Sequence, residues 1–312
     1  MPLDPHLAAM RDERARAGVP PLYSLSIAQA RAADLAAIRA SGGAPEPVFQ
    51  VVDTDLPGPD GPLPVRVYRP SDRRPLPVLA YFFGGGWTLG SIDTSDGICR
   101  SLANAAGCLV VTVGYRLAPE HRFPAAVRDC AAAVRWIVAS ADDLGADPGR
   151  VAVGGDSAGG NLAAAVTLSA RDLDLAGQVL VYPNTDHAAD SGSMRDNTDP
   201  YLFNQHSVAW YWDHYLATPE DGRDPLASPL YAEDLSGLPP ALVLTAEYDP
   251  LRDQGEAYAK RLADAGVPVT LTRYPGMAHG FFAMAGTVDA GKQAIAQVAE
   301  QLRTWFAEGF GR

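Results

Sequence analysis

Two patterns of hydrophobic positions recur along the chain, and together they predict an α/β fold. Short apolar runs typical of buried strands span residues 49–55, 63–68, 78–83, 109–115, 151–154, 177–181, 241–246 and 269–274. From the third run onward, apolar residues at helical spacing separate most runs, at about residues 94–106, 124–140, 158–170 and 251–265. The first two runs flank a Pro-Gly-Pro-Asp-Gly turn, which favours a hairpin. The pattern predicts an eight-stranded, mostly parallel sheet with an antiparallel start.

Two segments lie outside this alternation of strands and helices. Residues 5–18 and 26–41 have helical patterns but precede the first strand, so they predict an N-terminal appendage. The segment from about 185 to 225 interrupts the passage between two strands. Its aromatic residues recur at helical spacings and are too numerous for an ordinary surface crossover; they are Tyr201, Phe203, Trp210, Tyr211, Trp212 and Tyr215.

Composition narrows the classes of partner. The 312 residues carry a net charge of −12, which argues against binding to nucleic acid and to anionic membranes. No stretch has the length needed to cross a bilayer, and the N-terminus lacks the apolar core of a secretory signal. Cys99, Cys108 and Cys130 show no metal-binding spacing, so we expect buried free thiols. These features predict a cytoplasmic protein.

The first candidate for chemistry is a serine between an apolar strand and a helix. Val151–Gly154 leads into Gly155-Asp156-Ser157-Ala158-Gly159, and a helix of small residues follows. In this G-x-S-x-G arrangement the serine stands on a sharp turn, where a base and a substrate can both reach it. Glycine is expected at positions 155 and 159 because a side chain would collide with nearby backbone. The alternative is a glycine-rich turn that contains serine by chance.

A serine nucleophile needs a base and an acid that orients the base. His279 lies in a loop of small residues after the last strand, and Asp249 follows the preceding strand. The three residues thus have the chain order Ser, Asp, His that this kind of fold requires. Glu247 and Asp253 are rival acids, and Asp249 could instead only shape the turn at Pro250.

A glycine-rich loop is a candidate for stabilising an oxyanion. Phe83-Gly84-Gly85-Gly86-Trp87 directly follows an apolar strand, and consecutive glycines let backbone N–H groups face a substrate. The alternative is a phosphate-binding loop. Because no Lys-Ser/Thr pair follows and no G-x-G-x-x-G is present, nucleotide binding is disfavoured.

Together these motifs resemble the hormone-sensitive-lipase-like branch of the α/β-hydrolase esterases, also called bacterial family IV. The resemblance covers roughly residues 45–305 and rests on five segments: Phe83-Gly84-Gly85-Gly86-Trp87, Tyr115-Arg116-Leu117-Ala118-Pro119-Glu120-His121, Gly155-Asp156-Ser157-Ala158-Gly159-Gly160, Asp249-Pro250-Leu251-Arg252-Asp253 and His279-Gly280-Phe281. It implies that Ser157 is the nucleophile, Asp249 the orienting acid and His279 the base. It also implies oxyanion-binding N–H groups at Gly85, Gly86 and Ala158.

The resemblance also implies a helical cap, built from the N-terminal helices and an insertion late in the sheet. The corresponding division of the chain is cap helices at 1–45, hydrolase core at 46–184, cap insertion at 185–225 and hydrolase core at 226–312. One residue departs from the family, because Phe83 stands where the glycine loop usually has histidine. We expect apolar contacts with Trp87 or cap aromatics to hold the loop; the alternative is a neutral substitution.

The predicted activity is hydrolysis of short- to medium-chain or aryl carboxylic esters through an acyl-enzyme, without a metal or an organic cofactor. Phe83, Trp87, Tyr201 and Phe203 are the candidates for lining a pocket for a small-molecule ester, whereas Trp210, Tyr211 and Trp212 could form only the core of the cap. A non-catalytic receptor is one alternative, although plant gibberellin receptors of this branch lack the histidine that is present here. An amidase or acyltransferase with the same triad is another. A homodimer through residues 269–305 is expected by analogy only.

Overall fold

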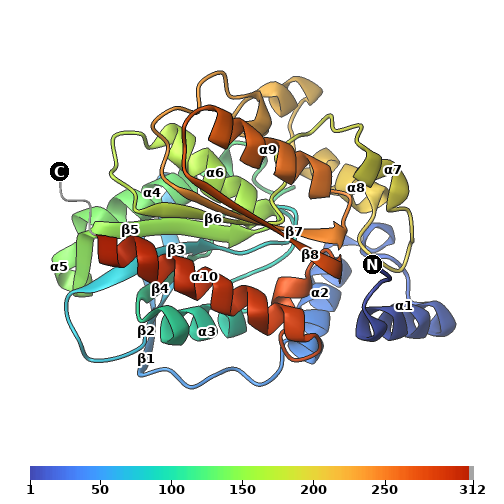
Figure 1. Cartoon of the computed structure of the whole chain (residues 1–312), viewed down its shortest axis with the longest axis horizontal. Coiled ribbons are helices and arrows are strands. Elements are labelled where there is room, and N and C mark those ends of the chain that lie inside the picture. Colours follow the sequence, from blue (N-terminus) through green and yellow to red (C-terminus); the bar gives the residue numbers. More distant parts are fainter. Residues whose placement is uncertain (309–312) are drawn as a thin grey trace.

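A single eight-stranded sheet forms the centre of the computed structural model, which describes residues 1–308 (Figure 1). The strands are β1 (Gln50–Gly58), β2 (Gly61–Arg69), β3 (Leu76–Phe82), β4 (Leu109–Val113), β5 (Ala146–Asp156), β6 (Gly177–Val181), β7 (Ala241–Tyr248) and β8 (Val269–Ala278). Their order is β1-β2-β4-β3-β5-β6-β7-β8. β2 pairs antiparallel with β1 and β4, and every other pairing is parallel. The predicted mostly parallel sheet with an antiparallel start is confirmed.

Helices cover both faces of the sheet, which explains the continuously apolar strands (Figure 1). On one face lie α4 (Ala125–Ala139), α6 (Ala158–Ser169) and α9 (Arg252–Asp264); on the other lie α3 (Asp96–Ala106) and α10 (Asp289–Glu308). In β3, Val78, Ala80 and Phe82 join the first core, whereas Leu79 and Tyr81 join the second. Because a strand buried on both faces needs apolar side chains at every position, the run has no polar alternation.

Two strands are longer than their apolar runs. β5 begins at Ala146, where the backbone pairs with Leu76 of β3 before a shift of register. The polar, partly exposed residues that follow Ala146 hide this start from a hydrophobicity pattern. β8 continues to Ala278, which pairs with Tyr248 after another shift. The expected loop before His279 is therefore partly strand, and this histidine directly follows the end of β8.

The segments outside the alternation lie together near one end of the sheet. They contain α1 (Pro5–Ala17), α2 (Ile27–Ser41), α7 (Gly192–Asp196) and α8 (Gln205–Tyr215), which occupy the right-hand side of Figure 1, near the arrowheads of β7 and β8. The short α5 (Ala141–Leu144) belongs to neither segment and lies between α4 and β5 in the chain. Ser26 begins α2 with a capping box, in which its hydroxyl accepts from the Gln29 N–H and the Gln29 side chain accepts from the Ser26 N–H. Arg14 of α1 donates to the Tyr201 carbonyl at 3.3 Å, so the two segments are in direct contact.

The three cysteines are buried and form no disulfide. Burial raises the pKa of the Cys99, Cys108 and Cys130 thiols, so they are inert side chains of the core. Within residues 1–308, no helix is both long and apolar enough to cross a membrane.

Candidate active site

Ser157 stands on the turn between β5 and α6 with an unusual backbone conformation. Its φ of 56° and ψ of −118° lie in a region that a residue with a side chain rarely adopts. Two glycines make the turn possible, because a Cβ at Gly155 or at Gly159 would overlap the carbonyl oxygen of Phe82. The serine is therefore held where β5 ends, as the motif predicts.

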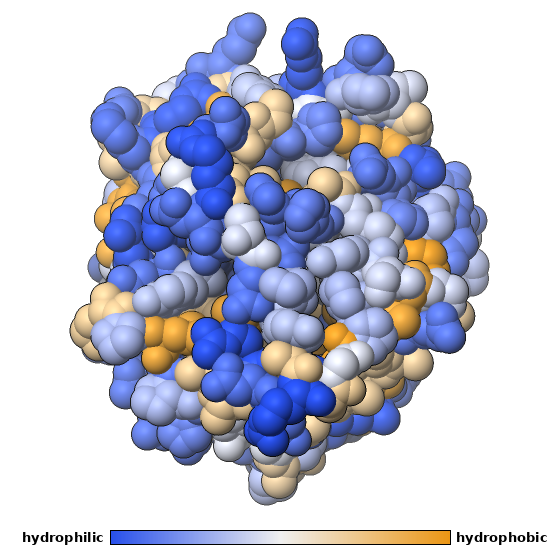
Figure 2. Space-filling view, turned by 90° about the vertical axis from the view of Figure 1, so that its right-hand side faces the viewer, coloured by the Kyte–Doolittle hydropathy of each residue, from blue (hydrophilic) through white to orange (hydrophobic). Residues whose placement is uncertain are grey.

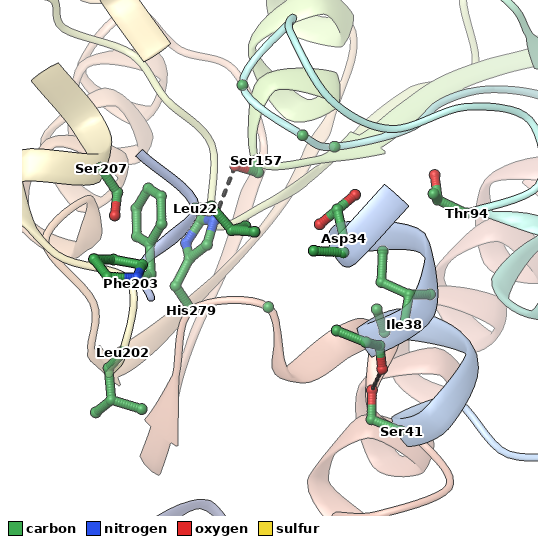
Figure 3. A pocket seen from close by; sticks show the side chains of 18 of the residues that line it. Leu22, Asp34, Ile38, Ser41, Thr94, Ser157, Leu202, Phe203, Ser207 and His279 are labelled. Carbon is green, nitrogen blue, oxygen red and sulfur yellow. Dashed lines mark hydrogen bonds between the residues drawn. The ribbon is translucent and has the colours of Figure 1, made fainter. Parts of the chain in front are cut away.

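The structure brings Ser157, Asp249 and His279 into one hydrogen-bonded chain. Figure 3 shows the link between Ser157 and His279. The Nε2 atom of His279 lies 2.9 Å from the Ser157 Oγ, and its Nδ1 atom lies 2.7 Å from the Asp249 Oδ2. Asp249 is completely buried, and its Oδ1 accepts from the Leu251 N–H at 2.8 Å. One carboxylate thus both shapes the turn after β7 and contacts the imidazole.

The rival acids bind elsewhere. Glu247 accepts from the N-terminal amine and from the Gly276 N–H, each at 2.7 Å. Asp253 accepts from the Ser193 N–H at 2.8 Å and pairs with the Arg252 guanidinium. Of the three carboxylates that the sequence offers here, Asp249 is the one that contacts His279.

The glycine loop lies beside the serine and is fastened to it by a buried carboxylate. The Asp156 Oδ1 accepts from the Gly84 N–H at 3.1 Å and from the Tyr81 hydroxyl at 2.7 Å. Burial raises the pKa of Asp156, and these two donors act in the opposite direction by stabilising its ionised form. Gly85 and Gly86 both have positive φ, 115° and 57°, and both line the cavity at Ser157.

Ala158 is the first residue of α6 and is fully buried. The first N–H groups of a helix have no partner within the helix and carry partial positive charge. Among residues 1–308, the N–H groups of Gly85, Gly86 and Ala158 donate to no protein acceptor, whereas the Ser157 N–H donates to the Val181 carbonyl. These three N–H groups are consequently available to an anion at the serine.

A family model described as the alpha/beta hydrolase fold matches residues 79–283. The carboxylic ester hydrolase LipN of Mycobacterium tuberculosis is 44% identical to this chain over 305 residues, covering 94% of this chain and 81% of that protein. The ethyl acetate hydrolase of Pseudomonas putida is 40% identical over 319 aligned positions, covering 97% and 99%. A hyperthermophilic esterase from the archaeon Pyrobaculum calidifontis has a solved structure that superposes with a TM-score of 0.93 at 41% identity, covering 97% and 99%.

The chain belongs to the hormone-sensitive-lipase-like branch of the α/β hydrolases. It is a carboxylic ester hydrolase. The predicted fold and family are therefore confirmed, and the remaining features of the site can be described as those of an esterase.

In this esterase Phe83 is held by stacking rather than by a polar side-chain contact. Its ring lies 4.3 Å from that of Tyr115 with an interplanar angle of 19°, and the Tyr115 hydroxyl donates to the Phe83 carbonyl at 2.8 Å. The expected ring partners were Trp87 or cap aromatics. Trp87 instead stacks on Tyr215 of α8 at 4.1 Å. The Phe83 ring is thus held by packing as expected, but its stacking partner is Tyr115, and hydrogen bonds from Tyr115 to the Phe83 carbonyl and from the Gly84 N–H to Asp156 also hold the loop.

A cavity of about 400 Å³ opens at Ser157. Phe83, Tyr201 and Phe203 line it as predicted, whereas Trp87 does not, because it is fully buried among aromatic rings. Residues 1–45 and 185–225 supply much of the wall, including Leu22, Ile38, Leu202, Trp210 and Tyr211. The outer face at this end of the molecule is mostly hydrophilic, with small separate apolar areas (Figure 2).

Two aromatic rings flank the imidazole, and the sequence reveals neither contact. Phe203 stacks on His279 with centroids 4.1 Å apart and an angle of 20°, and Tyr182 lies 4.4 Å away. Tyr182 immediately follows β6, but no motif marks it. The sequence analysis also did not predict that Asp156 holds the glycine loop, although its position between Gly155 and Ser157 in the nucleophile motif marks it as a candidate.

Proposed function

We propose that this ester hydrolase cleaves small carboxylic esters through an acyl-enzyme on Ser157. One observation carries the proposal: the continuous chain from the Ser157 Oγ to the His279 Nε2 at 2.9 Å, and from the His279 Nδ1 to the Asp249 Oδ2 at 2.7 Å. Both distances suit direct proton transfer and orientation of the base.

In the first step His279 accepts the Ser157 proton at Nε2 as the Oγ attacks the ester carbonyl. Asp249 accepts the Nδ1–H, which selects the reactive tautomer and stabilises the imidazolium. The N–H groups of Gly85, Gly86 and Ala158 then donate to the tetrahedral oxyanion. Each such donor lowers the barrier by about 3 kcal/mol.

The proton then moves from Nε2 to the alkoxide oxygen of the leaving alcohol, and the C–O bond breaks to leave the acyl-enzyme. In the second step the neutral imidazole takes a proton from water, whose oxygen attacks the acyl carbonyl. Collapse of the second tetrahedral intermediate returns the proton to Ser157 and releases the carboxylic acid.

Short- to medium-chain and aryl esters are the substrates we propose. A cavity of about 400 Å³ is at the small end of ligand pockets, and the aromatic rings of Tyr201, Phe203 and Tyr211 suit an aryl or alkyl group. Similarity to an ethyl acetate hydrolase over almost the whole chain supports the short end of this range.

Residues 1–45 and 185–225 form the cap in this proposal, and residues 46–184 and 226–312 form the core. Support comes from the walls that both segments contribute to the cavity and from the contact between Arg14 and the Tyr201 carbonyl. Pairing through residues 269–305 and a cytoplasmic location stay predictions.

An acyl-chain series tests the proposal. p-Nitrophenyl esters from acetate to dodecanoate are assayed with the wild type, with Ser157→Ala and with Ser169→Ala, a control that removes an exposed hydroxyl twelve residues further along the chain, on α6. We expect a burst and turnover with the shorter esters in the wild type and in Ser169→Ala, and loss of both in Ser157→Ala. Binding without turnover in the wild type would favour the receptor alternative, and faster cleavage of the matching anilides would favour an amidase.

A further inference from the structure

A carboxyl group without a protein partner faces the cavity from the cap. Asp34 lies on α2 and lines the cavity on the side opposite Phe203 and His279 (Figure 3). Its Oδ2 atom is buried and has no hydrogen-bond partner among residues 1–308. A buried polar atom without a partner is unfavourable, and more so when it is charged.

Local structure gives this carboxyl no role. Asp34 lies seven residues beyond the start of α2 at Ile27, so it neither caps the helix nor lies in its first turn. Aspartate is also unfavourable inside a helix, because its side chain competes for backbone hydrogen bonds. The nearest wall residues of the same helix, Ala33, Ala37 and Ile38, are apolar, and the hydroxyl of Ser41 at the end of the helix donates to the Ala37 carbonyl. The position therefore places a polar group among apolar ones.

The charged groups around the cavity do not neutralise Asp34. Arg31, one turn earlier on α2, pairs with Glu120 and donates to the carbonyls of Thr88 and Ala118. Arg14 of α1 donates to the Tyr201 carbonyl. Asp156, at the end of β5, has the same sign, and Tyr211 of α8 is also buried near Asp34.

Burial, followed by the charge of Asp156, raises the pKa of Asp34 to about 7. Near neutral pH both the neutral and the ionised form of this carboxyl are therefore present, and a ligand that donates a hydrogen bond to its oxygen would favour the ionised form.

We propose that Asp34 determines specificity by accepting a hydrogen bond from the substrate. The favoured esters carry a hydroxyl or ammonium group away from the ester bond, and this group donates to Asp34. An ester with only hydrocarbon groups would leave the carboxyl without a hydrogen-bond partner. This inference rests on the proposed hydrolysis at Ser157, and it names the class of substrate. Sites that bind a polar group reject analogues lacking it, because their own polar atoms are then left unpaired.

Matched esters that differ in one terminal group test the inference from both ends of the substrate. On the alcohol side the pair is 4-hydroxybutyl acetate and pentyl acetate. On the acyl side the set is methyl 6-hydroxyhexanoate, methyl 6-aminohexanoate and methyl heptanoate. Acid release in a pH-stat gives kcat/KM for the wild type, Asp34→Asn, Asp34→Leu and Asp213→Asn, a control that removes an exposed carboxylate of α8.

We expect the wild type and Asp213→Asn to favour at least one donor-bearing ester over its methyl analogue by about tenfold to a hundredfold, the range of a hydrogen bond to a charged group. The ratio should approach one in Asp34→Leu and be intermediate in Asp34→Asn, whose amide oxygen still accepts. Because each ratio compares two esters on one protein, partial misfolding of a variant leaves it unchanged.

Equal ratios in the wild type and Asp34→Leu would overturn the inference while leaving the proposed function intact. If the wild type released no more acid from any ester than Ser157→Ala does, the proposed function itself would fail. Comparing the ammonium ester with the hydroxyl esters separates a preference for positive charge from a preference for any hydrogen-bond donor. Loss of either preference in Asp34→Leu supports the inference.

Discussion

Replacing Phe83 by alanine is expected to destabilise the fold by about 3–5 kcal/mol, the usual cost of removing a phenyl ring from a core. Phe83 is 2% exposed and stacks on Tyr115 at 4.3 Å, so its truncation removes buried apolar contacts and enlarges the cavity that the ring lines. The stacked pair contributes about 0.5–1.5 kcal/mol beyond the buried area. The backbone contact from the Tyr115 hydroxyl to the Phe83 carbonyl survives the change, so the loop keeps one of its anchors.

Urea unfolding of the wild type, Phe83→Ala and Val52→Ala measures the effect. Val52 is 41% exposed, so its truncation should change the free energy of unfolding by no more than about 0.5 kcal/mol. The kcat for p-nitrophenyl acetate should also fall in Phe83→Ala, by less than the hundredfold or more that loss of a whole oxyanion donor causes. A change in unfolding free energy below about 1 kcal/mol, with unaltered kcat, would refute the packing role of Phe83.

Three further predictions concern the neighbourhood of the site. Tyr115→Phe leaves the buried Phe83 carbonyl without its donor, so we expect a loss of about 1–3 kcal/mol in urea unfolding and a lower kcat; unchanged values would contradict the anchor. Gly159→Ala places a Cβ against the Phe82 carbonyl, and we expect no active folded protein by circular dichroism and ester assay. Asp34→Asn should stabilise the fold increasingly from about pH 4 to pH 7. Folding raises the pKa of Asp34 from 3.8 to about 7, so in this range the wild-type carboxyl ionises in the unfolded chain before it does in the folded one, and the wild type loses stability that the variant keeps. This rise corresponds to at most about 4 kcal/mol, reached above pH 7, and a gain that is equal at pH 4 and pH 8 would contradict it.

The apolar runs predicted all eight strands because parallel strands buried on both faces leave a continuous signal. Boundaries were less accurate where pairing extends into polar sequence. The start of β5 at Ala146 and the end of β8 at Ala278 depend on backbone hydrogen bonds to neighbouring strands, and a single sequence does not display such bonds.

The residues of the hydrogen-bonded chain could be predicted because the carboxyl ends of parallel strands meet at one edge of a sheet. Contacts made by residues 1–45 and 185–225 could not be predicted. Phe203 stands 76 positions before the imidazole that it stacks on, and Asp34 occupies a helix with an ordinary pattern. Which face of α2 lines the cavity depends on how residues 1–45 pack on the rest of the chain, and helical periodicity does not determine that packing.

Covalent trapping tests the proposed mechanism most directly. The wild type is mixed with p-nitrophenyl butyrate, quenched in acid during the first turnover, and analysed by intact mass and peptide mapping. We expect one butyryl group on the peptide that contains residue 157, and none in Ser157→Ala. Steady release of butyrate with no acylated peptide, or with the acyl group on another residue, would contradict the account.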